Sequence, residues 1–281
     1  MYTLPDLSSW FDPAQDRIIA AVGAGGKSSI LEFLALVLKR SGQRVLLTTT
    51  TRIFRPEISG FCQHVDSVID HDVEAQLKIP AHSGTITVVG LPCENPKKLS
   101  APDKKLFSEL IHQNKYDNIL IESDGSRHLP LKAPSLHEPV IPEDSQVVLG
   151  VTGWKGLAQP ATNETIHRWD YFSRITGIAE GDPVDPQAMC RLLKSSNGLF
   201  KCSPEGAKRI WLINQVDSIN ERQAASHFIQ TVNIFSPTIQ HALISQLHNP
   251  SLPFIEEVLP ETGLPPTLIT NNYQQQFEDS P

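Results

Sequence analysis

The chain has 281 residues, of which 40% are hydrophobic and 20% charged, and its net charge is −7. This composition is typical of a folded globular protein, and the acidic balance argues against a nucleic-acid-binding platform, which usually carries a basic excess. The four cysteines form neither a C-x-x-C pair nor a zinc-finger spacing, so no structural zinc site is expected.

The start of the chain and its apolar runs argue against export and membrane insertion. Residues 1–16 contain no Lys or Arg, and the longest apolar run, residues 30–38, is far too short to span a bilayer. We therefore expect a cytoplasmic protein with neither a membrane segment nor a nucleic-acid partner.

Short apolar runs alternate with helical patterns along most of the chain. Residues 17–22 form a first buried strand, and residues 28–40 follow as a helix that is apolar on nearly every face. A second helix is expected at residues 101–114, and further strands at residues 44–48, 85–90, 118–122, 146–151 and 209–213. Strands separated by helices predict an α/β fold, with a mostly parallel sheet flanked by helices and ligands bound at the carboxyl ends of its strands.

Three segments differ from this alternation. Residues 130–142 are rich in proline and predict an ordered, largely irregular loop, whereas residues 155–203 favour helices and predict a small helical insertion or lid. Residues 271–281 have few apolar side chains and predict a disordered tail. We expect residues 1–270 to form a single domain.

A glycine-rich segment joins the first strand to the first helix. Glycines let the backbone curl around a phosphate, and the following helix offers its positive end. Lys27 can reach the β- and γ-phosphates of a nucleotide, and the Ser28 hydroxyl can bind Mg²⁺. The pattern G-x-x-x-x-G-K-S/T is matched except at its first position, where the chain has Ala21. The predicted phosphate-binding residues are Gly23, Ala24, Gly25, Gly26, Lys27, Ser28 and Ser29.

The same glycines partly match the dinucleotide fingerprint G-x-G-x-x-G. That motif requires an acidic residue at the end of the second strand to hold a ribose hydroxyl. This chain has four threonines there, at residues 48–51, and the sequence therefore favours a P-loop. Thr49, Thr50 and Thr51 are candidates for contacts with Mg²⁺ or the γ-phosphate, although β-branched residues also simply extend strands.

The strand at residues 118–122 ends in an acidic residue. A carboxylate in this position holds Mg²⁺ or its water shell in P-loop enzymes, and either Glu122 or Asp124 could serve. Gly125 would let the backbone approach the γ-phosphate. We therefore predict Lys27, Asp124 and Glu122 as catalytic residues and Ser28, Asp124 and Glu122 as metal ligands.

A late strand ends in Asn214 and Asp217, which keep the end positions of the guanine-binding pattern N-K-x-D. Gln215 replaces its lysine. Asn214 and Asp217 are therefore candidate base contacts, and an ordinary turn after a strand explains them about equally well.

Several charged residues remain outside these motifs. Arg52 and Arg55 could neutralise phosphate charge, and Arg127 and Lys132 lie in or next to the proline-rich loop. No role follows from the spacing of His137, Glu138, His167 and Arg168.

Together, the segments VGAGGKSS (22–29), TTTTR (48–52), ESDGSRHLPLKAP (122–134) and HEPVIP (137–142) resemble the YqeC family. The resemblance covers most of the chain up to about Asp217. The family's middle block usually has Ala where this chain has Ser123. The resemblance implies an accessory role in the maturation of a selenium-dependent molybdenum hydroxylase or its cofactor, with the hydroxylase or a maturation protein as partner.

These observations predict a protein that binds ATP or GTP with Mg²⁺ and works as a nucleoside triphosphatase switch. Two alternatives share the same loop: a kinase that phosphorylates a cofactor precursor, and a non-enzymatic scaffold gated by nucleotide. Many P-loop switches work as dimers across the nucleotide, so a homodimer is also an expectation.

Overall fold

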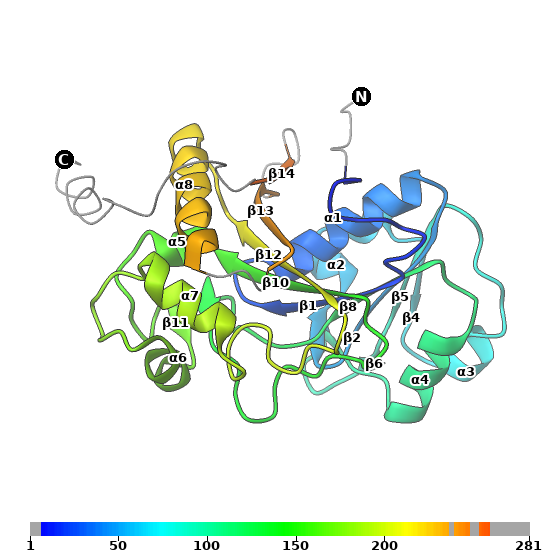
Figure 1. The fold of residues 1–281 in the computed structure, drawn as a ribbon. Helices are drawn as coiled ribbons and strands as arrows, with labels where there is room; N and C mark the ends of the chain where they lie inside the picture. The colour runs from blue at the N-terminus through cyan, green and yellow to red at the C-terminus, as the bar shows by residue number, and fades with distance from the viewer. Residues whose placement is uncertain (1–6, 236–238, 248–252, 259–281) are drawn as a thin grey trace.

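The computed structural model describes residues 7–235, 239–247 and 253–258 (Figure 1). The predicted tail at residues 271–281 and the end of the expected domain lie outside the described residues. None of the helices in the described part of the chain is long and apolar enough to cross a membrane.

A nine-stranded sheet runs through the centre of the molecule. Its order is β14-β13-β12-β10-β1-β8-β2-β5-β4, and every neighbouring pair is parallel except β13 and β14. The strands are β1 (Ile18–Gly23), β2 (Arg44–Thr49), β4 (Ser67–Ile69), β5 (Thr85–Val89), β8 (Asn118–Glu122), β10 (Val147–Gly153), β12 (Lys208–Asn214), β13 (His241–Gln246) and β14 (Phe254–Glu257). This confirms the predicted α/β fold with a mostly parallel sheet.

Helices cover both faces of the sheet (Figure 1). The helices are α1 (Lys27–Arg40), α2 (Pro56–Ser59), α3 (Val73–Gln76), α4 (Lys104–His112), α5 (Trp154–Leu157), α6 (Trp169–Thr176), α7 (Pro186–Lys194) and α8 (Ile219–Phe235), with a 3-10 turn at Cys62–His64. Successive side chains of a strand point to opposite faces. Accordingly, Ile19 packs with α1, whereas Val22 packs with α6, α7 and α8, and Ile18 packs with α3 and α4.

Two small sheets lie beside the main one, and neither was predicted. The first is antiparallel and contains β3 (Arg52–Phe54), β7 (Lys98–Ser100) and β6 (Leu91–Pro92). The second pairs β9 (Leu131–Lys132) with β11 (Ile166–His167). Both follow strands of the main sheet at their carboxyl ends, so they add side chains to the edge where ligands bind in such folds.

The boundaries of most predicted elements agree with the structure to within a few residues. The helix expected at residues 101–114 is shorter, because Asp103 caps it by accepting a hydrogen bond from Leu106 N at 2.9 Å and Ser100 belongs to β7. Residues 130–142 contain β9 and are otherwise without helix or strand. The segment 155–203 contains α6, α7 and most of α5, together with β11.

Candidate functional site

The glycine-rich loop lies tightly against the ends of two neighbouring strands. Gly23, Gly25 and Gly26 have φ values of 94°, 87° and 119°, in the region that favours glycine. A Cβ atom on Gly25 would lie 2.3 Å from Gly153 N, and one on Gly26 would lie 2.3 Å from Asn214 Nδ2. These glycines are therefore required both for the dihedral angles and for the close packing of the loop.

Ala21, at the first position of the motif, does not disturb the loop. It lies inside β1, paired in register with Leu149 of β10 and Glu122 of β8, and its side chain is buried in the core that packs against α1. The bend begins after this residue, so the methyl group occupies a core position.

The beginning of α1 leaves a row of backbone donors unused. The N–H groups of residues 25–29 donate to no acceptor within the described residues, and the first bond of this turn runs from Ile30 N to Gly26 O. Gly26 caps the helix without a side-chain bond. Unpaired N–H groups and the positive end of the helix dipole make such a terminus a site for anions.

Lys27 is buried at the bottom of this site. Its Nζ donates to Gly23 O at 2.7 Å and lies 3.1 Å from Asp124 Oδ1 and 3.9 Å from Glu122 Oε1. Burial alone would lower the pKa of Lys27, but the charges of Asp124 and Glu122 outweigh it and hold the pKa above its ordinary value. Lys27 therefore stays positively charged although it is buried.

Glu122 is the acid next to the hydroxyl of the loop. Ser28 Oγ donates to Glu122 Oε2 at 2.6 Å. Burial raises the pKa of Glu122, and Lys27 and Ser28 oppose the shift. Mg²⁺ is usually held by one or two protein oxygens together with phosphates and waters, so this hydroxyl–carboxylate pair fits Mg²⁺. The described residues contain no group of three or more His, Cys, Asp or Glu that could hold a metal by themselves.

Glu32 lies one turn further along α1, on the helix that carries Ser28. It is half-buried, and burial raises its pKa to about 7, with hydrogen bonding to Ser59 opposing the shift and the charge of Glu122 adding to it.

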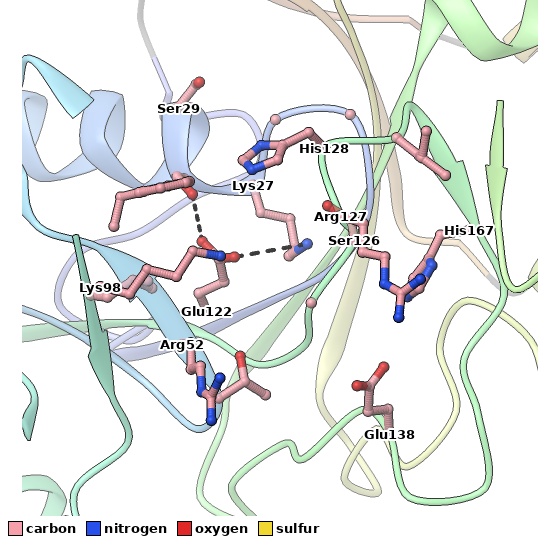
Figure 2. Close-up of a pocket in the computed structure, with 18 of the residues that line it drawn as sticks. Lys27, Ser29, Arg52, Lys98, Glu122, Ser126, Arg127, His128, Glu138 and His167 are labelled. Carbon is pink, nitrogen blue, oxygen red and sulfur yellow. Dashed lines mark hydrogen bonds and ion pairs between the residues drawn. The ribbon is translucent and has the colours of Figure 1, made fainter. Parts of the chain in front are cut away.

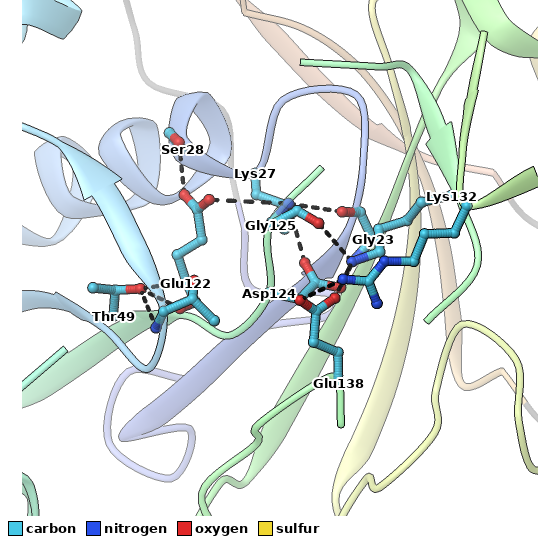
Figure 3. A network of polar contacts seen from close by, with 11 residues as sticks. Gly23, Lys27, Ser28, Thr49, Glu122, Asp124, Gly125, Lys132 and Glu138 are labelled. Carbon is cyan, nitrogen blue, oxygen red and sulfur yellow. Dashed lines mark hydrogen bonds and ion pairs between the residues drawn. The ribbon is translucent and has the colours of Figure 1, made fainter. Parts of the chain in front are cut away.

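Asp124 is engaged with the protein on both sides. Its Oδ2 accepts from Gly23 N at 3.0 Å and lies 2.9 Å from Lys132 Nζ, while Oδ1 faces Lys27 (Figure 3). The side chain is almost completely buried. Of the two acids that the sequence left open, Glu122 therefore lies next to Ser28, and Asp124 supports Lys27 and the start of the loop.

Lys132 extends this network into the proline-rich loop. It is buried, and its Nζ donates to Gly125 O at 2.6 Å and to Glu138 Oε2 at 2.9 Å. The other oxygen of Glu138 pairs with Arg168 at 2.8 Å, and Arg168 has φ 64° at the start of α6. A continuous chain of charges thus joins the glycine-rich loop to residues 130–142 and to α6 (Figure 3).

The three threonines after β2 have different surroundings. Thr49 is buried and donates to Glu122 O at 2.8 Å. Thr50 donates to Val140 O at 2.7 Å and so ties the proline-rich loop to the sheet. Thr51 lines the pocket described below.

Asn214 and Asp217 both have partners within the protein. The buried Asn214 donates from Nδ2 to Gly25 O at 2.8 Å and accepts from Ser245 Oγ at 2.9 Å, so it supports the glycine-rich loop. Asp217 pairs with Lys155 at 2.9 Å and does not line the pocket. Gln215, between them, does line it.

A pocket of about 620 Å³ opens in front of these residues (Figure 2). It includes Gly25, Gly26, Ser28, Ser29 and Gly125 of the predicted set. Its basic lining residues are Lys27, Arg52, Lys98, Arg127, His128, His167 and Arg168, and its acidic ones are Glu122 and Glu138. The excess of basic side chains suits a polyanion.

Some of these residues escaped the sequence analysis. Lys98 belongs to no motif and reaches the pocket only because β7 pairs with β3, and His128 lies in the segment 122–134 but was given no role there. His167 has an unusual environment: burial and the neighbouring charges of Lys132 and Arg168 lower its pKa to about 4. Arg55, by contrast, is absent from the pocket lining and pairs with Asp70 at 2.8 Å.

Comparisons with known proteins identify relatives. The model of the family described as YqeC protein matches residues 19–170. The chain is 35% identical over 222 residues to Uncharacterized protein YqeC of Escherichia coli (strain K12), an alignment that covers 77% of this chain and 84% of that protein. Among solved structures, the crystal structure of FlhF complexed with GMPPNP/Mg²⁺ matches with a TM-score of 0.42 and 13% identity, covering 92% of this chain and 76% of that one. The family match and the bacterial relative together show that this chain belongs to the YqeC family.

Proposed function

We propose that this protein binds a nucleoside triphosphate with Mg²⁺ in the pocket and hydrolyses it as a molecular switch. The observation that carries the proposal is the combination at the start of α1: five backbone N–H groups at residues 25–29 that have no acceptor among the described residues, the buried cation Lys27, and the Ser28–Glu122 pair. The N–H groups and Lys27 suit the negative charge of a triphosphate, and the Ser28–Glu122 pair suits Mg²⁺.

The residues have separate roles in this proposal. The N–H groups and Lys27 hold the phosphates, and Ser28 and Glu122 hold Mg²⁺, which neutralises the charge that builds up on the phosphates. Asp124 positions Lys27 and the amide of Gly23 from behind. Thr51 and Gly125 line the pocket beside the metal ligands, where we place the γ-phosphate.

In this proposal, the nucleotide base lies near Gln215, away from the metal ligands. Asn214 is committed to Gly25 and Ser245, so we assign it to loop support and keep Asp217 as the candidate base contact. Asp217 would have to give up its ion pair with Lys155, whose side chain is 54% exposed. Such an exchange would favour guanine over adenine.

The charge network offers a route for the switch. Phosphates that bind Lys27 compete with Asp124 for its ammonium group. The ion pair of Asp124 with Lys132 would then become stronger, and Lys132 also pairs with Glu138 in the proline-rich loop. Nucleotide binding and phosphate release would shift this balance and move residues 130–142, as loops around a γ-phosphate do in other switches. The resemblance to the YqeC family supports assigning the switch to maturation of a selenium-dependent molybdenum hydroxylase or its cofactor.

A kinase acting on a cofactor precursor is the second candidate. It is favoured by one specific observation, the basic side chains Arg52 and Lys98 on the far side of the pocket from Gln215. Product analysis separates the two, because a kinase yields a phosphorylated acceptor and a switch yields free phosphate.

The proposal is tested by calorimetric titration with non-hydrolysable ATP and GTP analogues, with and without Mg²⁺. We expect one nucleotide to bind with Mg²⁺, Lys27→Ala to lower its affinity by about 100-fold, and Ser28→Ala to remove most of the Mg²⁺ dependence. Lys97→Ala changes an exposed lysine outside the pocket and should bind as the wild type does. Unchanged affinity in the Lys27 and Ser28 variants would sink the proposal. With hydrolysable ATP or GTP, tight binding without release of phosphate would point instead to a nucleotide-gated scaffold.

A further inference from the structure

The pocket extends beyond the space assigned to the nucleotide. In the main sheet, β12 lies on one side of the β1–β8 pair and β2 on the other. Gln215 follows β12, and Arg52 begins β3 shortly after β2, so these pocket residues mark opposite ends. A triphosphate on residues 25–28, with its base toward Gln215, leaves the β3 end for another group.

The β3 end differs chemically from the loop. Arg52 and Lys98, like Arg127, form no ion pair with any acid in the described part of the chain, whereas Lys27, Lys132 and Arg168 all do. Figure 2 shows Lys98 and Arg52 near Glu122, on the opposite side from Arg127 and His167. The charge of Lys98 is felt at Glu122, where it helps to oppose the raised pKa.

An aromatic surface accompanies these two cations. Lys98 Nζ lies 4.6 Å from the centre of the Phe54 ring, and Phe54 stacks on His128 with ring centres 5.3 Å apart. Ile53 and Leu129 line the same pocket. Unpaired cations beside apolar and aromatic side chains suit a small organic molecule that carries an anionic group, and an arginine can bind phosphate through two parallel hydrogen bonds.

We propose that Arg52 and Lys98 bind the phosphate group of a second, phosphorylated small molecule, with its organic part against Phe54 and His128. The inference rests on the proposed function for the position of the nucleotide, which occupies residues 25–28 at the same time. The two ligands would meet near Glu122 and Ser28, where the metal is placed.

The test is a titration of protein already saturated with Mg²⁺ and a non-hydrolysable triphosphate analogue, using inorganic phosphate and phenyl phosphate as probes. We expect both probes to bind and phenyl phosphate to bind more tightly, because its ring can contact Phe54. Arg52→Ala and Lys98→Ala should each weaken probe binding about tenfold, the effect of one charge-assisted contact. Lys97→Ala, next along the chain, is the matched control and should leave binding unchanged.

Two results would overturn the inference. The first is probe binding that is absent from the nucleotide-loaded protein or insensitive to both substitutions. The second is that the Arg52 and Lys98 variants lose more affinity for the nucleoside triphosphate than for the diphosphate. These side chains would then hold the γ-phosphate of the nucleotide. The Lys27→Ala protein separates the two proposals. If this variant does not bind nucleotide but still binds the probes in a way that depends on Arg52 and Lys98, the second site is supported independently of the first.

Discussion

The two sides of the pocket are built in opposite ways. On the glycine-loop side, the charged groups Lys27, Glu122, Asp124 and Lys132 are buried and bonded to one another. On the β3 side, Arg52 is exposed, Lys98 is half-buried, and neither has an acidic partner among the described residues. Buried charges depend on their partners because desolvation is costly, whereas solvated charges are stable alone. Folding therefore fixes the first side in advance, and the second side is left to pair with a ligand.

The largest expected difference between the two sides concerns stability. Lys132→Ala would leave Asp124 and Glu138 without a shared cation in a buried site, and we expect a loss of about 3–5 kcal/mol in the free energy of unfolding. Lys98→Ala should change it by less than about 0.5 kcal/mol. Urea unfolding of both variants measures these two changes in the free energy of unfolding. Equal changes would contradict the difference between the two sides.

A smaller effect is expected in the pH dependence of nucleotide binding. In the proposed site, the carboxylate form of Glu122 would hold Mg²⁺, and the pKa of Glu122 is raised by burial. The Mg²⁺-dependent part of the affinity should therefore fall as pH decreases through that raised pKa, beginning at a higher pH than for an ordinary glutamate. Glu122→Gln should lose about 2 kcal/mol of Mg²⁺-dependent binding at neutral pH and most of its pH dependence.

Lys97→Ala supplies the control for that titration, since Lys97 is exposed and outside the pocket, and this variant should keep the wild-type pH profile. A Glu122→Gln protein that retained the full pH dependence would assign the titration to another group and remove Glu122 from the metal site.

The smallest predicted effect concerns Glu32, behind the glycine-loop side. Its folded-state pKa of about 7 exceeds its ordinary value, so the folded protein binds a proton more tightly than the unfolded chain does. The unfolding free energy should therefore decrease as pH rises from the ordinary value to about 7 and then level off. Glu32→Gln should remove this decrease. The full difference in pKa corresponds to about 3 kcal/mol, and solvent screening of the half-buried side chain reduces the expected gain at pH 8 to about 1–2 kcal/mol relative to wild type. Thermal unfolding across this pH range measures it, and parallel profiles would contradict it.

The sequence predicts six strands of the main sheet and the glycine-rich loop because both are local patterns, whereas β4, β13 and β14 were not predicted. Continuous apolar runs mark β1, β2, β8 and β12, and the loop residues are adjacent in the chain. The spacing of Glu122 and Asp124 could not show which of them lies next to Ser28. The answer depends on Lys132, which belongs to a separate sheet and forms an ion pair with Asp124.

The β3 side was harder to predict for the same physical reason. Strands β6 and β7 have only two and three residues, too few for a clear periodic pattern, and Lys98 reaches the pocket through pairing with a strand more than forty positions earlier. Asn214 shows the converse case: its position after β12 was recognised from sequence, but its contact with Gly25 depends on how the loop folds back over the sheet.

The link from Ser245 through Asn214 to Gly25 has a consequence for any attempt to shorten this protein. The family match ends at residue 170, yet the hydrogen bond that steadies Gly25 comes from β12, and the hydroxyl that orients Asn214 comes from β13. A fragment trimmed to the matched segment would also strip β10 of its partner along seven paired positions. We therefore expect the smallest stably folded unit to be larger than the matched segment, because β12 and β13 support the glycine-rich loop from outside that segment.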